Sequence, residues 1–171
     1  MGLTTAYLSL GSNIEPRKNL ANAVRSIQYE FQECKVSSVY QTPAQGFIGE
    51  DFLNLAIEIN TEMSLADLLT YTDTLEQGAG RVRVRRGNFD SRTLDVDVVV
   101  YGDLVGMYEA RIWPAEDIAD YGHVLKPLAE IAPTNREPLN GKTFDQLWCQ
   151  FDKKDQFEIV CQRHNLEWLF T

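Results

Sequence analysis

The hydrophobic residues of this chain recur with two periods, and their order predicts an α+β fold. Residues 5–10 and 52–60 alternate between apolar and other side chains, as strands with one buried face do. Residues 16–31 and 65–75 place apolar side chains three and four positions apart, as amphipathic helices do. The β-branched segment 36–40 adds a further strand.

A last strand at residues 92–101 completes the order strand, helix, strand, strand, helix, strand. This is the ferredoxin-like βαββαβ plan, in which one sheet carries helices on one face. We expect a single domain over residues 1–171, with the core at about 5–135 and an added C-terminal segment at about 136–171. Helices are expected at residues 114–120, 124–131 and 143–150, and a short strand at 157–161.

The strand at residues 92–101 is apolar except for its start and two acids, Asp95 and Asp97. Alternation places both acids on one face of the strand and the apolar residues between them on the other. Two carboxylates on one face can converge on a hard cation, and magnesium is usually held by one or two carboxylates together with substrate phosphates. The alternative is an edge strand whose acids only keep that face solvated.

The segment just before the acids, residues 81–92, is rich in arginine. It holds one acid, Asp90, and the arginines Arg81, Arg83, Arg85, Arg86 and Arg92. Guanidinium groups match phosphate oxygens, so the combination favours a site for polyphosphate and magnesium. A solvated basic loop or a nucleic-acid patch is the alternative. Nucleic acid is disfavoured by the net charge of −9, because backbone binding needs a larger basic surface.

Composition adds a few limits to this interpretation. The longest apolar run, residues 96–101, is far too short to span a membrane, and the first residues lack the pattern of a signal peptide, so we expect a cytoplasmic protein. Three cysteines and two histidines without close spacing indicate no zinc site.

Six segments in this order resemble the 6-hydroxymethyl-7,8-dihydropterin pyrophosphokinase family. They are Leu8-Ser9-Leu10-Gly11-Ser12-Asn13, Ser38-Val39-Tyr40-Gln41-Thr42-Pro43, Asp51-Phe52-Leu53-Asn54, Glu76 with Gly80-Arg81-Val82-Arg83, Arg92-Thr93-Leu94-Asp95-Val96-Asp97, and Pro127-Leu128-Ala129-Glu130-Ile131-Ala132-Pro133. The resemblance implies a ferredoxin-like enzyme of folate synthesis. Such an enzyme uses ATP as co-substrate and two Mg²⁺ ions to transfer pyrophosphate to the pterin hydroxymethyl group, releasing AMP.

The resemblance also assigns roles to the acids and arginines. Asp95 and Asp97 would bind both magnesium ions, with Asp95 also facing the substrate. Asp97, or its metal, would lower the cost of removing the hydroxyl proton. Arg81, Arg83 and Arg92 would be catalytic and grip phosphate oxygens, on a loop at residues 83–90 that closes over the site.

Pterin binding falls to other residues in the same resemblance. Asn54 would hydrogen-bond the pterin edge and Phe52 would lie against its ring, with the loop after Thr42 and Pro43 closing beside them. Glu76 would line the nucleotide pocket. For Glu76 the alternative is a solvated acid at a helix end.

The chain departs from the family pattern at three positions. Ala115 follows Pro114 where the family usually has His, and Tyr121 replaces an Arg that holds phosphate. His123 stands where a Phe usually stacks on the pterin. An imidazole can stack in the same way, although a structural or solvated His is the alternative. We expect these changes to affect rate more than the class of reaction.

Three classes of function remain at this point. The first is an active pyrophosphokinase whose partners are dihydropterin and ATP, without nucleic acid or membrane, acting as a monomer or weak homodimer. The second is a degenerate paralogue that binds pterin or nucleotide with weak or no turnover. The third is a structural or interaction module, which the paired acids disfavour because it would not need them.

Overall fold

One antiparallel sheet forms the centre of the computed structural model, which describes residues 2–44, 48–80 and 91–171. Its strand order is β5-β1-β4-β3-β8, and β2 pairs with β4 as well. The strands are β1 (Thr4–Ser12), β2 (Cys34–Val36), β3 (Val39–Thr42), β4 (Phe52–Thr61), β5 (Asp95–Tyr101) and β8 (Gln162–His164). β1 to β5 and the two helices between them follow the predicted βαββαβ order, with β2 and β3 together in the place of one predicted strand.

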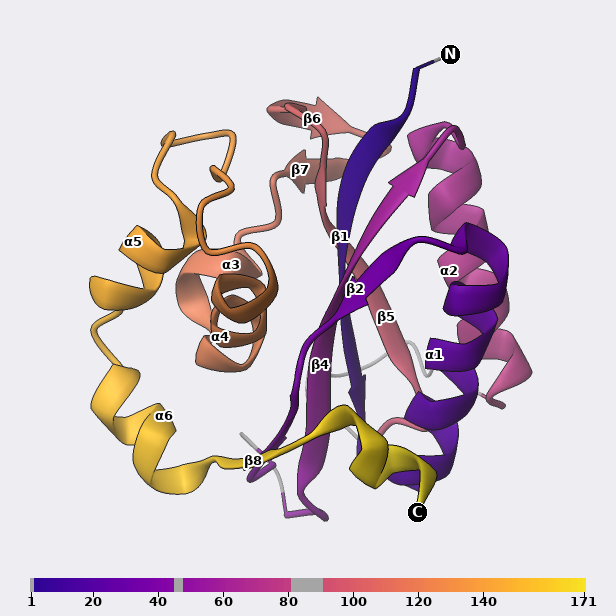
Figure 1. Ribbon diagram of the computed structural model, residues 1–171, viewed down its shortest axis with the longest axis vertical. Coiled ribbons are helices and arrows are strands. Elements are labelled where there is room, and N and C mark those ends of the chain that lie inside the picture. Colours follow the sequence, from indigo (N-terminus) through magenta and orange to yellow (C-terminus); the bar gives the residue numbers. More distant parts are fainter. Residues whose placement is uncertain (1, 45–47, 81–90) are drawn as a thin grey trace.

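Two long helices, α1 (Pro16–Phe31) and α2 (Leu65–Gly78), cover one face of the sheet (Figure 1). Pro16 occupies the first turn of α1, where its missing N–H costs nothing. Ser64 caps α2, because its hydroxyl accepts a 3.2 Å hydrogen bond from the Asp67 N–H. The core between the sheet and these helices includes Leu8, Leu10, Leu20, Val24, Ile27, Leu55, Ile57 and Leu68.

The opposite face of the sheet is covered by the later part of the chain (Figure 1). Its helices are α3 (Asp117–Asp120), α4 (Gly122–Ile131), α5 (Phe144–Cys149) and α6 (Lys154–Val160). Ala56 and Glu58 of β4 point toward this layer and are buried. The added helices therefore cover the second face of the sheet, which is the face on which Asp95 and Asp97 lie.

Several elements differ from the expectation. The strand predicted at residues 157–161 is wrong, because this stretch is the end of α6 and the strand follows it as β8. A short apolar run is compatible with a strand or a helix. Here the buried Phe157 ring packs against Tyr40 and Trp148 from a helix. The strand predicted at residues 36–40 is interrupted: β2 ends at Val36 and β3 begins at Val39.

Three short elements were not anticipated at all. They are β6 (Gly106–Tyr108), β7 (Arg111–Trp113) and a 3₁₀ helix, η1 (Leu166–Phe170). The first two form a two-stranded hairpin next to β5, and η1 packs against α1. Elements of three to five residues leave almost no periodic signal, which is why the sequence pattern did not reveal them.

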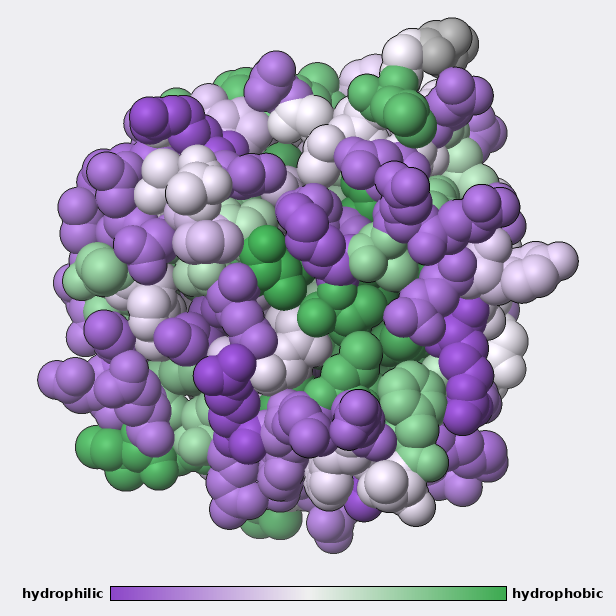
Figure 2. All heavy atoms as spheres, viewed as in Figure 1, coloured by the Kyte–Doolittle hydropathy of each residue, from purple (hydrophilic) through white to green (hydrophobic). Residues whose placement is uncertain are grey.

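The surface is mostly hydrophilic in the view of Figure 2, with hydrophobic residues gathered near its middle, over β2 and β4. At the outer strand of this region, Lys35 of β2 forms a 2.7 Å ion pair with Glu58. Among the helices that the structure describes, none has the length and apolar character needed to cross a membrane.

Candidate active site

The register of three neighbouring strands brings the predicted site residues together. Gly11 of β1 lies opposite Asn54 of β4 on one side and opposite Asp95 of β5 on the other. Directly opposed residues share a face, so Asn54 and Asp95 project from the same side of the sheet, about 10 Å apart across two strand spacings. Gly11 sends no side chain between them. Asp97, opposite Ser9, follows on the same face.

The acids Asp95 and Asp97 each have an arginine nearby. Arg92 Nη1 forms an ion pair and hydrogen bond with Asp95 Oδ2, and Arg111 Nη1 lies 3.8 Å from Asp97 Oδ1. Burial, followed by the charges of Asp95 and Glu76, raises the pKa of the Asp97 carboxyl above its usual range, while Arg111 opposes the shift. Two carboxylates held this close favour a cation between them.

Glu76 supports the acidic strand from behind. Its Oε1 accepts a 2.9 Å hydrogen bond from the N–H of Val96, the residue between the two acids. Only 3% of Glu76 is exposed, so the alternative of a solvated acid at a helix end is wrong. The predicted contact between Glu76 and a nucleotide stays a prediction.

The segment after β1 fixes the start of the acidic strand. Asn13 Oδ1 accepts a 2.7 Å hydrogen bond from the Arg92 N–H, and the Asn13 N–H donates to the Arg92 carbonyl at 3.0 Å. Ser12 donates from its hydroxyl to the Thr93 carbonyl at 2.6 Å. These bonds hold Arg92 beside Asp95 and join two motifs that are 79 to 81 positions apart in sequence.

Asn54 is buried and oriented by β3. Its Nδ2 donates to Thr42 Oγ1 at 2.9 Å and approaches the Tyr40 carbonyl at 3.4 Å. A Cβ at Gly11 would lie 3.2 Å from Asn54 Oδ1 and 3.9 Å from the Phe52 ring, so glycine keeps the space beside both open. The remaining residues predicted to bind pterin also lie here: Thr42 is buried, Phe52 is half-buried and Pro43 is exposed.

The N-terminal end of α4 faces the acids. His123 is close enough to Asp95 for that charge to raise its pKa, but burial is the larger effect and lowers the pKa to about 4. The imidazole is therefore neutral at pH 7. The Tyr121 ring lies beside it, with ring centroids 5.3 Å apart. His123 is thus only partly exposed and uncharged at pH 7, and it remains a candidate to stack on a planar ligand.

Comparison with known proteins gives this arrangement a family. The family model described as 7,8-dihydro-6-hydroxymethylpterin-pyrophosphokinase (HPPK) matches residues 7–133. The chain belongs to the HPPK family. A 2-amino-4-hydroxy-6-hydroxymethyldihydropteridine pyrophosphokinase of Methylorubrum extorquens AM1 is 38% identical over 135 residues, which are 77% of this chain and 84% of that protein. One of Bacillus subtilis 168 is 31% identical over 160 residues, covering 89% and 95%.

Solved structures are similar to this chain in fold. Two crystal structures of Plasmodium falciparum HPPK-DHPS variants, one with pterin and p-hydroxybenzoate and one with pteroate, match with TM-scores of 0.66 and 0.68 at 12% and 11% identity. Each match covers 94% of this chain but only 47% and 46% of those chains. The predicted α+β fold class is confirmed.

The HPPK fold also carries charged residues that sequence reasoning missed. Arg111 beside Asp97 belongs to the unforeseen hairpin β6–β7, so no pattern connected it to the site. Asp117, at the start of α3, lies near the same cluster. Burial raises the pKa of its carboxyl most, the charges of Asp120 and Asp95 raise this pKa further, and the Arg92 charge lowers it. Two of the predicted residues, Arg81 and Arg83, and the loop at 83–90 lie outside the described residues.

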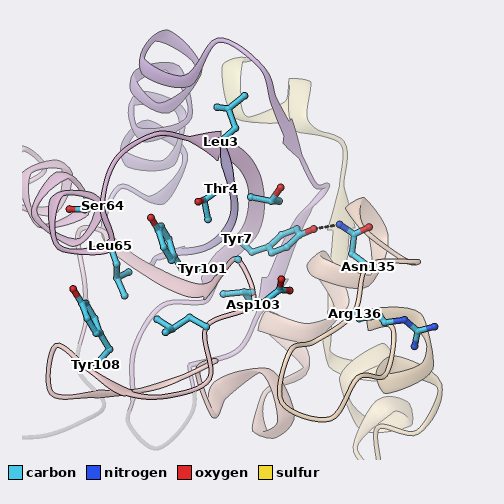
Figure 3. Close-up of a pocket in the computed structure, with 14 residues that line it drawn as sticks. Leu3, Thr4, Tyr7, Ser64, Leu65, Tyr101, Asp103, Tyr108, Asn135 and Arg136 are labelled. Atoms are coloured by element: carbon cyan, nitrogen blue, oxygen red, sulfur yellow. Dashed lines mark hydrogen bonds between the residues drawn. The ribbon is translucent and has the colours of Figure 1, made fainter. Parts of the chain in front are cut away.

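A cavity of about 840 Å³ lies at the other end of the sheet (Figure 3). Its lining includes Thr4, Tyr7, Tyr101, Asp103 and Arg136, and the Tyr7 hydroxyl accepts a hydrogen bond from Asn135. Among the described residues that line it, none is a predicted site residue. Within the described residues, no three His, Cys, Asp or Glu side chains are grouped so that they could hold a metal ion.

Proposed function

We propose that this chain transfers the β,γ-pyrophosphoryl group of ATP to 6-hydroxymethyl-7,8-dihydropterin, giving AMP and the pterin diphosphate. Membership of the HPPK family supports the reaction and its two substrates. One observation supports the assignment of residues: Asn54, Gly11 and Asp95 form a row across three adjacent strands. This row places the Asn54 amide, which can bind a heterocycle, on the same face of the sheet as the acids that can bind a metal.

Asp95 and Asp97 are the proposed ligands of two magnesium ions. Their side chains lie on one face of β5, and both remain partly exposed, at 18% and 44%. Hard oxygen donors of this kind, completed by phosphate oxygens and water, fit Mg²⁺. When bound, the ions would neutralise the charge of the triphosphate. When ATP binds, Arg92 and Arg111 would leave the carboxylates of Asp95 and Asp97 and contact phosphate oxygens instead. Guanidinium groups bind carboxylate and phosphate oxygens equally well.

The pterin is placed by the other end of the row. Because Thr42 and Tyr40 engage the Asn54 amide nitrogen, Oδ1 is the atom that accepts a hydrogen bond from the pterin edge. Phe52 and His123 would hold the ring between them, and a neutral imidazole suits this role because it carries no charge to desolvate. The hydroxymethyl group then points along the row toward Asp95.

The chemistry follows from this placement. The hydroxymethyl oxygen attacks the β-phosphorus, a new O–P bond forms as the bond to the α-phosphate oxygen breaks, AMP leaves and the hydroxyl proton is released. Transfer of this type depends on alignment and on neutralising phosphate charge. Arg92 supplies positive charge beside Asp95, and we retain Arg81 and Arg83 as further phosphate-binding residues and Glu76 as part of the nucleotide pocket.

We propose that residues 1–171 form one domain and act as a monomer or weak homodimer. A second candidate is a paralogue that binds pterin or nucleotide with little turnover. The changes at Ala115, Tyr121 and His123 favour it, because each replaces a group that the family pattern directs at a ligand.

The test is product formation from 6-hydroxymethyl-7,8-dihydropterin, ATP and magnesium, separated by chromatography. We expect AMP and pterin diphosphate in equal amounts, and neither with Asp97→Ala. Absence of AMP together with calorimetric binding of pterin or nucleotide would support the paralogue. Absence of both product and binding would refute both candidates.

A further inference from the structure

The C-terminal strand lies directly behind the proposed pterin residues. β8 pairs antiparallel with the outer edge of β3, with His164 opposite Val39 and Gln162 opposite Gln41. The inner edge of β3 pairs with β4, where Tyr40 is opposite Asn54. β3 is therefore hydrogen-bonded on both edges where it orients Asn54. Residues 162–171 lie beyond the part of the chain that matches the HPPK family model.

Two polar anchors hold this segment in place. Arg163 Nε donates to Ser38 Oγ at 2.9 Å, and Arg163 Nη2 pairs with Glu130 of α4 at 2.8 Å. At the far end, the Arg17 guanidinium of α1 lies 4.3 Å above the Trp168 ring, and it also donates to the Trp168 carbonyl. The segment thus ties both helical layers to the edge of the sheet.

The chain end is also held by packing. Leu169 is only 4% exposed and belongs to the core between the sheet and α1. A leucine buried to this degree contributes far more than an exposed one, so residues 166–170 are a packed element rather than a loose tail. The packing of residues 166–170 therefore holds β8 in place, so that a side chain of β8 has a fixed position relative to β3.

His164 is the side chain that reaches β3. Its ring stacks on Trp168, with centroids 3.9 Å apart and planes 10° apart, and Nε2 lies 3.3 Å from Gln41 Oε1. The other end of the Gln41 amide donates to Asp51 Oδ2 at 3.0 Å. Because the amide oxygen faces His164, this contact is a hydrogen bond when Nε2 carries the proton.

We propose that residues 162–171 are a positioning element of the pterin subsite, with His164 acting through Gln41. Gln41 joins the end of β3 to Asp51, the residue before β4, and so fixes the two strands where Thr42 pairs with Phe52. Thr42 in turn holds the Asn54 amide. The inference rests on the proposed function, because it concerns the same Asn54 and Phe52 that would bind pterin.

The test compares His164→Phe with Gln162→Ala in the full chain. Phenylalanine keeps the ring stack on Trp168 but removes the bond to Gln41, whereas Gln162 is an exposed residue of the same strand and serves as the control. We expect His164→Phe to raise the KM for the pterin about two- to tenfold, the effect of one lost hydrogen bond, without a change in the KM for ATP. Gln162→Ala should leave both constants unchanged.

A second comparison separates positioning from general stability. Gln41→Ala should raise the pterin KM as much as His164→Phe does, and the double variant should add little, because both changes break one chain of contacts. Equal increases in both KM values, or a lower Tm with unchanged pterin KM, would overturn the proposal. If the unmodified protein forms no AMP, the proposed function fails instead. The positioning role is then measured by pterin binding in calorimetry, with the same variants and the same expected ratios.

Discussion

Glu76 and Val96 connect the end of α2 to the acidic strand: the Glu76 carboxylate accepts a 2.9 Å hydrogen bond from the Val96 N–H. Among the described strands, β5 is the outermost on its side of the sheet, so one of its edges has no described strand partner to satisfy its backbone groups. Glu76 satisfies the group that lies between Asp95 and Asp97. A residue expected at the nucleotide also fixes the backbone that carries the proposed metal ligands.

Replacing Glu76 separates these two roles. Glu76→Leu leaves the Val96 N–H without its acceptor, and we expect a loss of about 1 to 3 kcal/mol in the free energy of unfolding. Glu76→Gln keeps an acceptor oxygen and should lose less than half as much. Urea unfolding measures both values. If Glu76→Gln also raises the KM for ATP, the charge acts on the nucleotide; equal destabilisation by both variants would contradict the role assigned to the Val96 bond.

Removing the Asp95 carboxylate should abolish magnesium-dependent nucleotide binding. Asp95→Ala deletes a proposed metal ligand, but its side chain is partly exposed and paired to Arg92, so we expect a change of less than about 1 kcal/mol in stability. Isothermal titration calorimetry with ATP and Mg²⁺ gives the affinity, and Asp152→Ala, which removes an exposed acid on the loop before α6, is the control. Unchanged nucleotide affinity in Asp95→Ala would exclude Asp95 as a metal ligand.

The sequence predicted those parts of the fold and site that long periodic segments carry. β1 and β4 alternate over most of their nine and ten residues, and β5 alternates over its first four, which predicted the face that carries Asn54, Asp95 and Asp97. The convergence of these residues depends on register, with Gly11 opposite both Asn54 and Asp95. Register is set by how the strands pair in the folded protein. The pattern of one strand therefore predicts which face of the sheet a residue lies on, but not which residue of the adjacent strand lies opposite it.

What the sequence could not give are contacts made by short elements. Arg111 belongs to a three-residue strand, and its position near Asp97 depends on how the hairpin folds back onto β5. His164 and Trp168 lie after a predicted strand that is in fact a helix, so their stacking beside Gln41 had no basis in the pattern. Their roles come from tertiary contacts between residues far apart in the chain.

Restoring the residues usual for the family should raise turnover. Tyr121 and Ala115 precede α4, and Tyr121 contacts His123, whose pKa responds to Asp95. An arginine at 121 or a histidine at 115 would add one charge-assisted contact to phosphate, worth about 1.5 to 3 kcal/mol, or one to two powers of ten in rate. We expect Tyr121→Arg and Ala115→His each to increase kcat, measured by AMP release.

Lys153→Arg, which exchanges one cation for another on the loop before α6, is the control for these two variants. No gain in kcat from either substitution would mean that the charges already present, such as Arg111 beside Asp97, compensate for the missing groups.

Glu130 makes the stability of the protein depend on pH. Burial would raise the pKa of its carboxyl, but hydrogen bonds from Ser38 and Tyr40 and the Arg163 charge outweigh burial and hold the pKa below its usual value of 4.5. A depressed pKa stabilises the folded state fully above the unfolded value, and this contribution is lost as the pH falls through the folded value.

Glu130→Gln should therefore lower the free energy of unfolding at pH 7 by about 1 to 3 kcal/mol, or the Tm by roughly 2 to 10 °C. The difference from the unmodified protein should shrink as the pH falls below 4.5 and through the lowered pKa of the folded state, because the original carboxyl then takes up a proton. Thermal unfolding at pH 7, 5 and 3 measures it, with Glu158→Gln on the exposed face of α6 as the control. A difference that stays constant down to pH 3 would mean that packing around Glu130, and not its charge, joins α4 to β3 and β8.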